Sequence, residues 1–141
     1  MTRQLNPSVG EMLDRCSILE LKMKAAADKR LELKHFTDEF IELQKVVSSK
    51  INATPVSFDF SMYEKHKDEL SMVNKKLWNY EDEVRALPRV SDSTPDQILR
   101  AAQLRELITD LNDCRADLVA KLNSFFGIHE QEKIYSCATQ K

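Results

Sequence analysis

Apolar residues recur at intervals of three and four along almost the whole of this 141-residue chain, which is the period of an amphipathic α-helix. Two glycines and four prolines leave few points at which such helices can be interrupted. Each helix then carries an apolar stripe, and a stripe left in water forfeits its burial energy. The sequence therefore predicts an all-α fold, an antiparallel bundle of about four helices in one domain, residues 1–141.

Capping residues indicate where the helices begin. Ser8 with Glu11 forms a capping box ahead of the first apolar repeat, and Ser61 with Glu64 forms another ahead of the third. Thr94, followed by a proline, is typical of the start of a fourth helix. These signals predict the first, third and fourth helices.

Other boundaries are less definite. The apolar spacing continues through residues 9–51, so either one long kinked helix or two helices fit, with Thr37 as a candidate cap between them. Pro88 should end the third helix and Gly127 the fourth. A short C-terminal helix is expected around residues 130–135.

Charge and hydropathy exclude several classes of protein. The net charge is −2, and Lys and Arg are dispersed among Asp and Glu, so the chain lacks the basic surface that binds nucleic acid. No apolar run approaches the roughly 18 residues of a membrane span, and residues 1–10 lack the apolar core of a signal peptide. We expect a cytoplasmic protein that binds neither nucleic acid nor membranes.

Three charged residues occupy positions where apolar ones are expected. Arg115 lies on the stripe of the fourth helix, between Leu111 and Leu118. Glu20 falls near the apolar arc of the first helix, and Glu81 flanks the stripe of the third. Because a lone buried charge costs several kcal/mol, opposite charges here should meet. We predict that Arg115 pairs with Glu81, Glu20 or both.

Further polar residues belong to the same neighbourhood. Asn112 precedes Arg115 by three residues on one side of the fourth helix, while Asn74, Trp78, Glu81 and Arg85 form a row on the third helix, with Asp82 beside it. The candidate ligand-binding residues are therefore Glu20, Asn74, Trp78, Glu81, Asp82, Arg85, Asn112 and Arg115.

This set of side chains suits a non-catalytic binding or accessory protein. A tryptophan face, carboxylates and guanidinium groups can hold a small polar anion of the nucleotide or sugar-nucleotide class, or a partner protein. A purely structural role is the alternative, since Arg–Glu pairs inside helical bundles commonly fix register. Ile18 and Leu21 fall away from the main stripe of the first helix, which favours a homodimer. No nucleophile–base pair is evident, and no cofactor is expected.

An enzymatic alternative rests on clustered carboxylates. Helical nucleotide pyrophosphatases hold Mg²⁺ between acidic pairs on facing helices. Here Glu11 and Asp14 have an E-x-x-D spacing, and an acidic row lies on the fourth helix, but that row lies opposite the apolar stripe, where solvated charges belong. The doubled E-E-x-x-E pattern of such enzymes is absent. The acidic row consists of Glu106, Asp110, Asp113 and Asp117.

Four segments resemble a bacterial family of small helical proteins of unknown function. Residues 8–22 are similar to its opening segment, and residues 73–85 carry its central L-W-x-x-E-D-x-x-R motif. Residues 111–123 match its L-N-x-x-R-A-x-L segment, and residues 130–135 match its E-x-K-x-Y tail. The regions 24–50 and 53–60 show no clear match.

Members of that family tend to be encoded near glycosyltransferases and other surface-glycan genes, so the resemblance implies a sugar or sugar-nucleotide context. It carries no established activity. The resemblance singles out Glu11 and Asp14 in addition to the eight candidate residues above.

Overall fold

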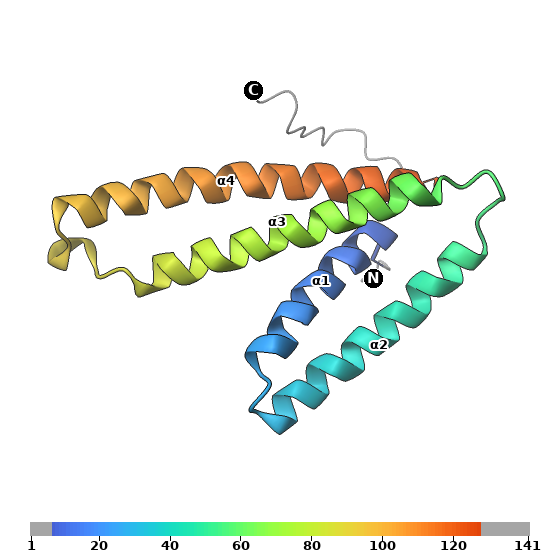
Figure 1. The fold of residues 1–141 in the computed structure, drawn as a ribbon, viewed down its shortest axis with the longest axis horizontal. Helices are drawn as coiled ribbons and strands as arrows, with labels where there is room; N and C mark the ends of the chain where they lie inside the picture. The colour runs from blue at the N-terminus through green and yellow to red at the C-terminus, as the bar shows by residue number, and fades with distance from the viewer. Residues whose placement is uncertain (1–6, 128–141) are drawn as a thin grey trace, which may run out of the picture.

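The computed structural model describes residues 7–127, which form four α-helices and contain no strand (Figure 1). The helices are α1 (Val9–Ala25), α2 (Arg30–Asn52), α3 (Phe60–Ala86) and α4 (Pro95–Ser124), with a short 3-10 turn, η1 (Val90–Asp92), before α4. None of these four is both long and apolar enough to cross a membrane. The predicted all-α fold of about four antiparallel helices is confirmed. The expected helix at 130–135 lies outside the described residues.

Two of the three predicted helix starts are confirmed. The Ser8 hydroxyl accepts a hydrogen bond from the Glu11 backbone N–H at 3.2 Å, and the Glu11 carboxylate accepts one from the Ser8 N–H at 2.8 Å. Thr94 forms the same reciprocal box with Gln97, at 3.2 and 2.9 Å. Both boxes satisfy backbone donors that a helix start leaves unpaired.

The third predicted start is wrong. Asp59, not Ser61, caps α3, because its carboxylate accepts the Met62 backbone N–H at 3.1 Å. The preceding Phe58 packs against the ring of Tyr63, with centroids 5.5 Å apart. This packing fixes where the chain enters the helix and brings Asp59, one residue later, into the capping position.

The open question in residues 9–51 is resolved in favour of two helices. α1 ends at Ala25 and α2 begins at Arg30, after a tight turn. Thr37 is not a cap. Its hydroxyl instead donates to the Leu33 carbonyl at 2.7 Å, inside α2, a contact that threonine commonly makes in the middle of a helix.

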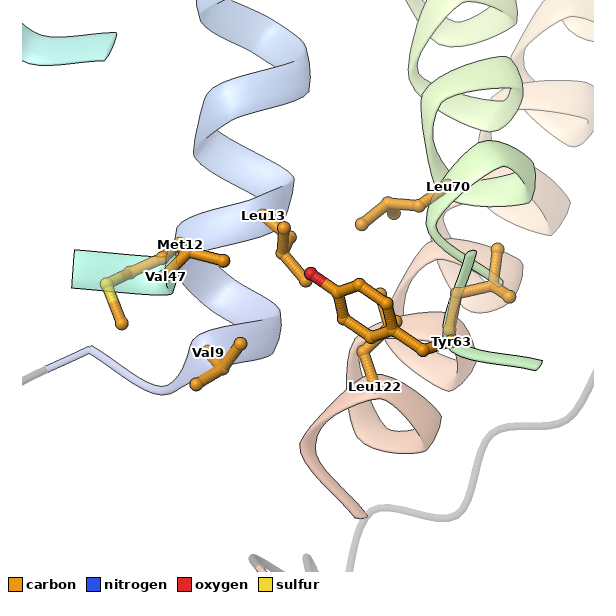
Figure 2. Packing of buried hydrophobic residues seen from close by; sticks show 8 residues of the cluster. Val9, Met12, Leu13, Val47, Tyr63, Leu70 and Leu122 are labelled. Carbon is orange, nitrogen blue, oxygen red and sulfur yellow. The ribbon is translucent and has the colours of Figure 1, made fainter. Parts of the chain in front are cut away.

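The main core lies where α1 begins, α2 ends, α3 begins and α4 ends. Figure 2 shows the Tyr63 ring of α3 pointing toward Leu13 of α1, with Leu122 of α4 nearby. Burial of each such side chain contributes about 1.5–3 kcal/mol. The cluster comprises Val9, Met12, Leu13, Val47, Tyr63, Leu70, Leu118 and Leu122.

The four helices form two hairpins of unequal length. α1 packs on α2, α3 and α4, whereas α2 packs chiefly on α1. α3 and α4 have 27 and 30 residues, but α1 has only 17, and α1 and α2 lean away from the longer hairpin (Figure 1). The far part of the α3–α4 hairpin, residues 79–108, therefore extends beyond the other helices. We call this part the arm.

Candidate functional site

Three helices meet at the carboxylate of Asp14 in α1. Arg115 of α4 donates to it twice, from Nε to Oδ1 at 2.8 Å and from Nη2 to Oδ2 at 2.6 Å. Asn74 of α3 donates to Oδ1 at 2.8 Å and also to the Ser17 hydroxyl, which itself donates to the Asp14 carbonyl at 2.9 Å. We call Asp14, Ser17, Asn74 and Arg115 the polar cluster.

A close approach between α1 and α4 positions this cluster. The Gly10 backbone N–H donates to the Asn123 side-chain oxygen at 2.7 Å. A Cβ atom on Gly10 would lie 2.4 Å from the Val119 carbonyl oxygen, so only glycine fits there. Asp14 follows Gly10 by one helical turn on the same side of α1. The missing side chain thus lets α1 come close enough for Asp14 to reach Arg115.

Charge is balanced within the cluster. The hydrogen bond that Arg115 donates to Asp14 raises the pKa of the guanidinium, burial opposes this rise, and the charges of Asp14 and Glu81 add to it. The side chains of Arg115 and Asp14 are only 31% and 16% exposed. The guanidinium is thus neutralised by a carboxylate of its own chain, which leaves little positive charge for an anionic ligand.

The predicted partners of Arg115 are wrong. Its ion-pair partner is Asp14, and both Glu20 and Glu81 are exposed. Glu20 lies two turns beyond the buried Leu13 on one face of α1, but its side chain is exposed. Glu81 stays within electrostatic range of Arg115 without an ion pair to it.

Trp78 lies one turn beyond Asn74 on α3, near the end of α1. It is half-buried and lines a shallow hollow of about 220 Å³ beside Lys22 of α1 and Phe36 of α2. Its two candidate roles, a packing contact and a platform for a ligand, both stay predictions. The indole occupies the angle where α1 and α2 diverge from α3.

The other predicted site residues lie on the surface. Asp82 and Arg85 form an ion pair one turn apart on α3, with side chains 56% and 65% exposed. Asn112 is exposed on α4. Of the eight candidate residues, Asn74 and Arg115 are the two from different helices that the structure joins through hydrogen bonds to one side chain, that of Asp14.

Four residues of this region are absent from the candidate set: Gly10, Asp14, Ser17 and Asn123. The family resemblance singles out Asp14, but not as the partner of Arg115. One signal is present in the sequence, because Gly10, Asp14 and Ser17 follow a spacing of four and three on the side of α1 away from its apolar stripe. Small residues at that spacing are typical of a close helix contact.

Three of the carboxylates considered for Mg²⁺ have other partners. Glu11 caps α1, Asp14 pairs with Arg115, and Asp117 pairs with Lys121 at 3.0 Å. Across residues 7–127, no three His, Cys, Asp or Glu side chains are grouped so that they could hold a metal ion. The described part of the chain thus lacks the convergence of acidic side chains that the hydrolase alternative requires.

A larger hollow lies at the opposite end of the molecule. It has a volume of about 510 Å³ and lies between the start of α1, the α2–α3 connection and the end of α4. Val9, Phe125 and Phe126 form part of its wall, and none of the eight predicted site residues lines it.

Comparisons with protein-family models, with curated proteins and with solved structures find no match to this chain.

Proposed function

We propose that this chain is a non-catalytic interaction protein that binds a partner protein along the arm. One observation carries the proposal, namely that the arm holds large apolar side chains in water. Val84 is 40% exposed, Ile98 45%, Leu99 58% and Val90 70%. A pair of helices can bury only the stripes that face each other, so a two-helix arm has surface left to cover.

The polar cluster supports a partner protein over a small anionic ligand such as a nucleotide or sugar-nucleotide. Arg115 already binds the Asp14 carboxylate through two nitrogen atoms. An anion that used this guanidinium would have to displace a carboxylate that cannot leave the site. Trp78, the other expected ligand contact, lines a shallow hollow with residues of α1 and α2, and Arg115 is not among the residues that line it.

The biological context of the partner is also a proposal. The L-W-x-x-E-D-x-x-R segment at 73–85 and the L-N-x-x-R-A-x-L segment at 111–123 resemble proteins encoded near glycosyltransferases. A protein of surface-glycan synthesis is therefore the first class of partner to test.

The direct test is site-specific photocrosslinking in intact cells. A photoreactive phenylalanine analogue replaces Leu99 on the arm, and in a matched control it replaces Glu42, which is exposed on α2. We expect discrete adducts from position 99 that the control lacks, identified by mass spectrometry. Position 99 yielding no adducts, or the same ones as position 42, would overturn the proposal. Saturable nucleotide binding abolished by Arg115→Ala would also contradict it.

A further inference from the structure

The side of the α3–α4 hairpin that contacts α1 continues along the arm without a covering helix. On α3, Glu81 follows Asn74 by seven residues, two helical turns, so both lie on the same side. On α4, Val119 lies against Gly10 of α1. Asn112 and Arg105 lie seven and fourteen residues before Val119, so all three are on the same side of α4. Beyond the polar cluster α1 and α2 lean away (Figure 1). We call this uncovered side of the arm the open face.

The middle of the open face is apolar. Val84 follows the buried Leu77 by two turns on α3 and is 40% exposed. Across from it, Ile98 of α4 is 45% exposed and Ala101 is half-buried. The ion pair of Glu83 with Arg100, at 2.6 Å, shows which residues of α3 and α4 lie side by side. Val84 and Ile98 are near this pair, so they lie close to one another along the arm.

Opposite charges flank Val84 along α3. Glu81 lies three residues before it and Arg85 one residue after it, and the two are four apart on one side of the helix. Glu81 has no ion-pair partner among residues 7–127, and Arg85 pairs only with its exposed neighbour Asp82. Such surface pairs contribute little and exchange readily.

This pattern is complementary to itself when two helices run in opposite directions. If two antiparallel α3 helices cross at the level of Glu83, midway between Glu81 and Arg85, Glu81 of each faces Arg85 of the other, and the two Val84 side chains lie one residue from the axis. We infer that the partner on the open face is a second copy of this chain, bound through antiparallel arms about a two-fold axis. The inference rests on the proposed function, because it takes the arm to be an interaction surface.

The shape of the molecule accommodates this arrangement. With antiparallel arms, the α1–α2 hairpins of the two copies lie at opposite ends of the dimer. Since each hairpin leans away from its own arm (Figure 1), the second arm can lie along the open face. The two arms then form a four-helix bundle, in which the apolar surface of each is covered by the other.

The test uses charge reversal and mixing. Glu81→Arg sets the introduced arginine against Arg85 of the other copy, and Arg85→Glu sets the introduced glutamate against Glu81, twice in each homodimer. Mixing the two variants replaces every repulsion with an attraction. By light scattering at micromolar concentration, we expect the native chain at twice its 16.3 kDa mass and each variant at the monomer mass. An equimolar mixture of the variants should return to the dimer mass.

Two further measurements complete the experiment. Glu42→Arg reverses a charge on α2 and should leave the dimer intact, and unchanged circular dichroism confirms that every variant is folded. A native chain of monomer mass overturns the inference, while adducts from position 99 would leave the proposed function standing. Dimers that persist in both single variants, or variants that stay monomeric when mixed, also overturn it. Loss of both the dimer and the adducts would reject the two proposals together.

Discussion

Arg115 and Asp14 lie 101 residues apart in the sequence, yet the guanidinium of one meets the carboxylate of the other through two nitrogen atoms, at 2.8 and 2.6 Å. This contact joins the first helix to the last, and Asn74 adds the third helix through the same carboxylate. The polar cluster thus fixes how the two hairpins cross.

We predict that Asp14 and Arg115 are energetically coupled. In a double-mutant cycle of Asp14→Ala, Arg115→Ala and the double variant, the coupling energy should be about 1–2 kcal/mol. Each single change leaves a half-buried charge without its partner, whereas the double change removes both charges. Urea unfolding at pH 7 and low salt measures all four free energies of unfolding.

The Asp82–Arg85 pair is the matched control for this cycle. It joins the same residue types, but its side chains are more than half exposed, so its coupling energy should stay below about 0.5 kcal/mol. Equal coupling energies in the two cycles would contradict the role assigned to the polar cluster.

Gly10→Ala should destabilise the protein even though alanine is the better helix former. The new Cβ atom would lie 2.4 Å from a backbone oxygen of Val119, and it would also crowd the hydrogen bond to Asn123. The helices must separate to admit it, which we expect to cost at least about 2 kcal/mol beyond the roughly 1 kcal/mol gained in helix propensity. Thermal unfolding followed by circular dichroism gives the change.

Gly127→Ala is the control, because alanine at this position strains the backbone but does not push two helices apart. Gly127 has φ +81°, and no atom of residues 7–127 lies within 4 Å of the added Cβ, so only backbone strain of about 1 kcal/mol is expected. A Gly10→Ala protein as stable as the native one would exclude the close approach of α1 to α4.

The sequence predicts local features of this fold better than contacts between helices. Apolar spacing and the caps at Ser8 and Thr94 depend on residues close in sequence, and the structure confirms them. The Asp59 cap escapes prediction because it depends on Phe58 packing against Tyr63, a tertiary contact. Local patterns carry no information about such contacts.

The partner of Arg115 escapes prediction for a related reason. A helical wheel reports the direction of a side chain but not what lies in that direction. Glu20 falls near the apolar arc by this measure, yet its side chain is exposed in the folded chain. Asp14 points away from the apolar stripe of α1, but α1 has neighbours on both sides, and the side of Asp14 faces α3 and α4. Which helix faces each side of α1 depends on how the two hairpins cross, and this is not encoded in the helical spacing.

The ion pair between Arg15 of α1 and Glu39 of α2 should make stability depend on pH. Its hydrogen bond, at 2.8 Å, lowers the pKa of the Glu39 carboxyl in the folded state. The resulting stability is present above the unfolded pKa and is lost as the pH falls through the lowered folded value. Glu39→Gln should therefore cost about 0.5 kcal/mol at pH 7, and the difference from the native protein should vanish in acid.

Urea unfolding of both proteins between pH 3 and pH 7 measures this difference. Glu42→Gln is the control, since the Glu42 side chain is 73% exposed and lies 3.7 Å from Lys45, and it should show no such trend. A Glu39→Gln effect of the same size at pH 3 and pH 7 would rule out the ion pair as its source.

The fluorescence of Trp78 should change when a residue of the α1–α2 hairpin is altered and stay unchanged when the polar cluster is altered. Because the indole lines a hollow with Phe36 and Lys22, Phe36→Ala admits water to its surface, and the fluorescence maximum should shift to the red by several nanometres, with stronger acrylamide quenching. Arg115→Met removes the guanidinium, keeps an apolar stem of similar length and should leave both signals unchanged. As the chain contains a single tryptophan, the emission has no other indole source. A shift with Arg115→Met and none with Phe36→Ala would place Trp78 beside Arg115 and revive the small-ligand pocket.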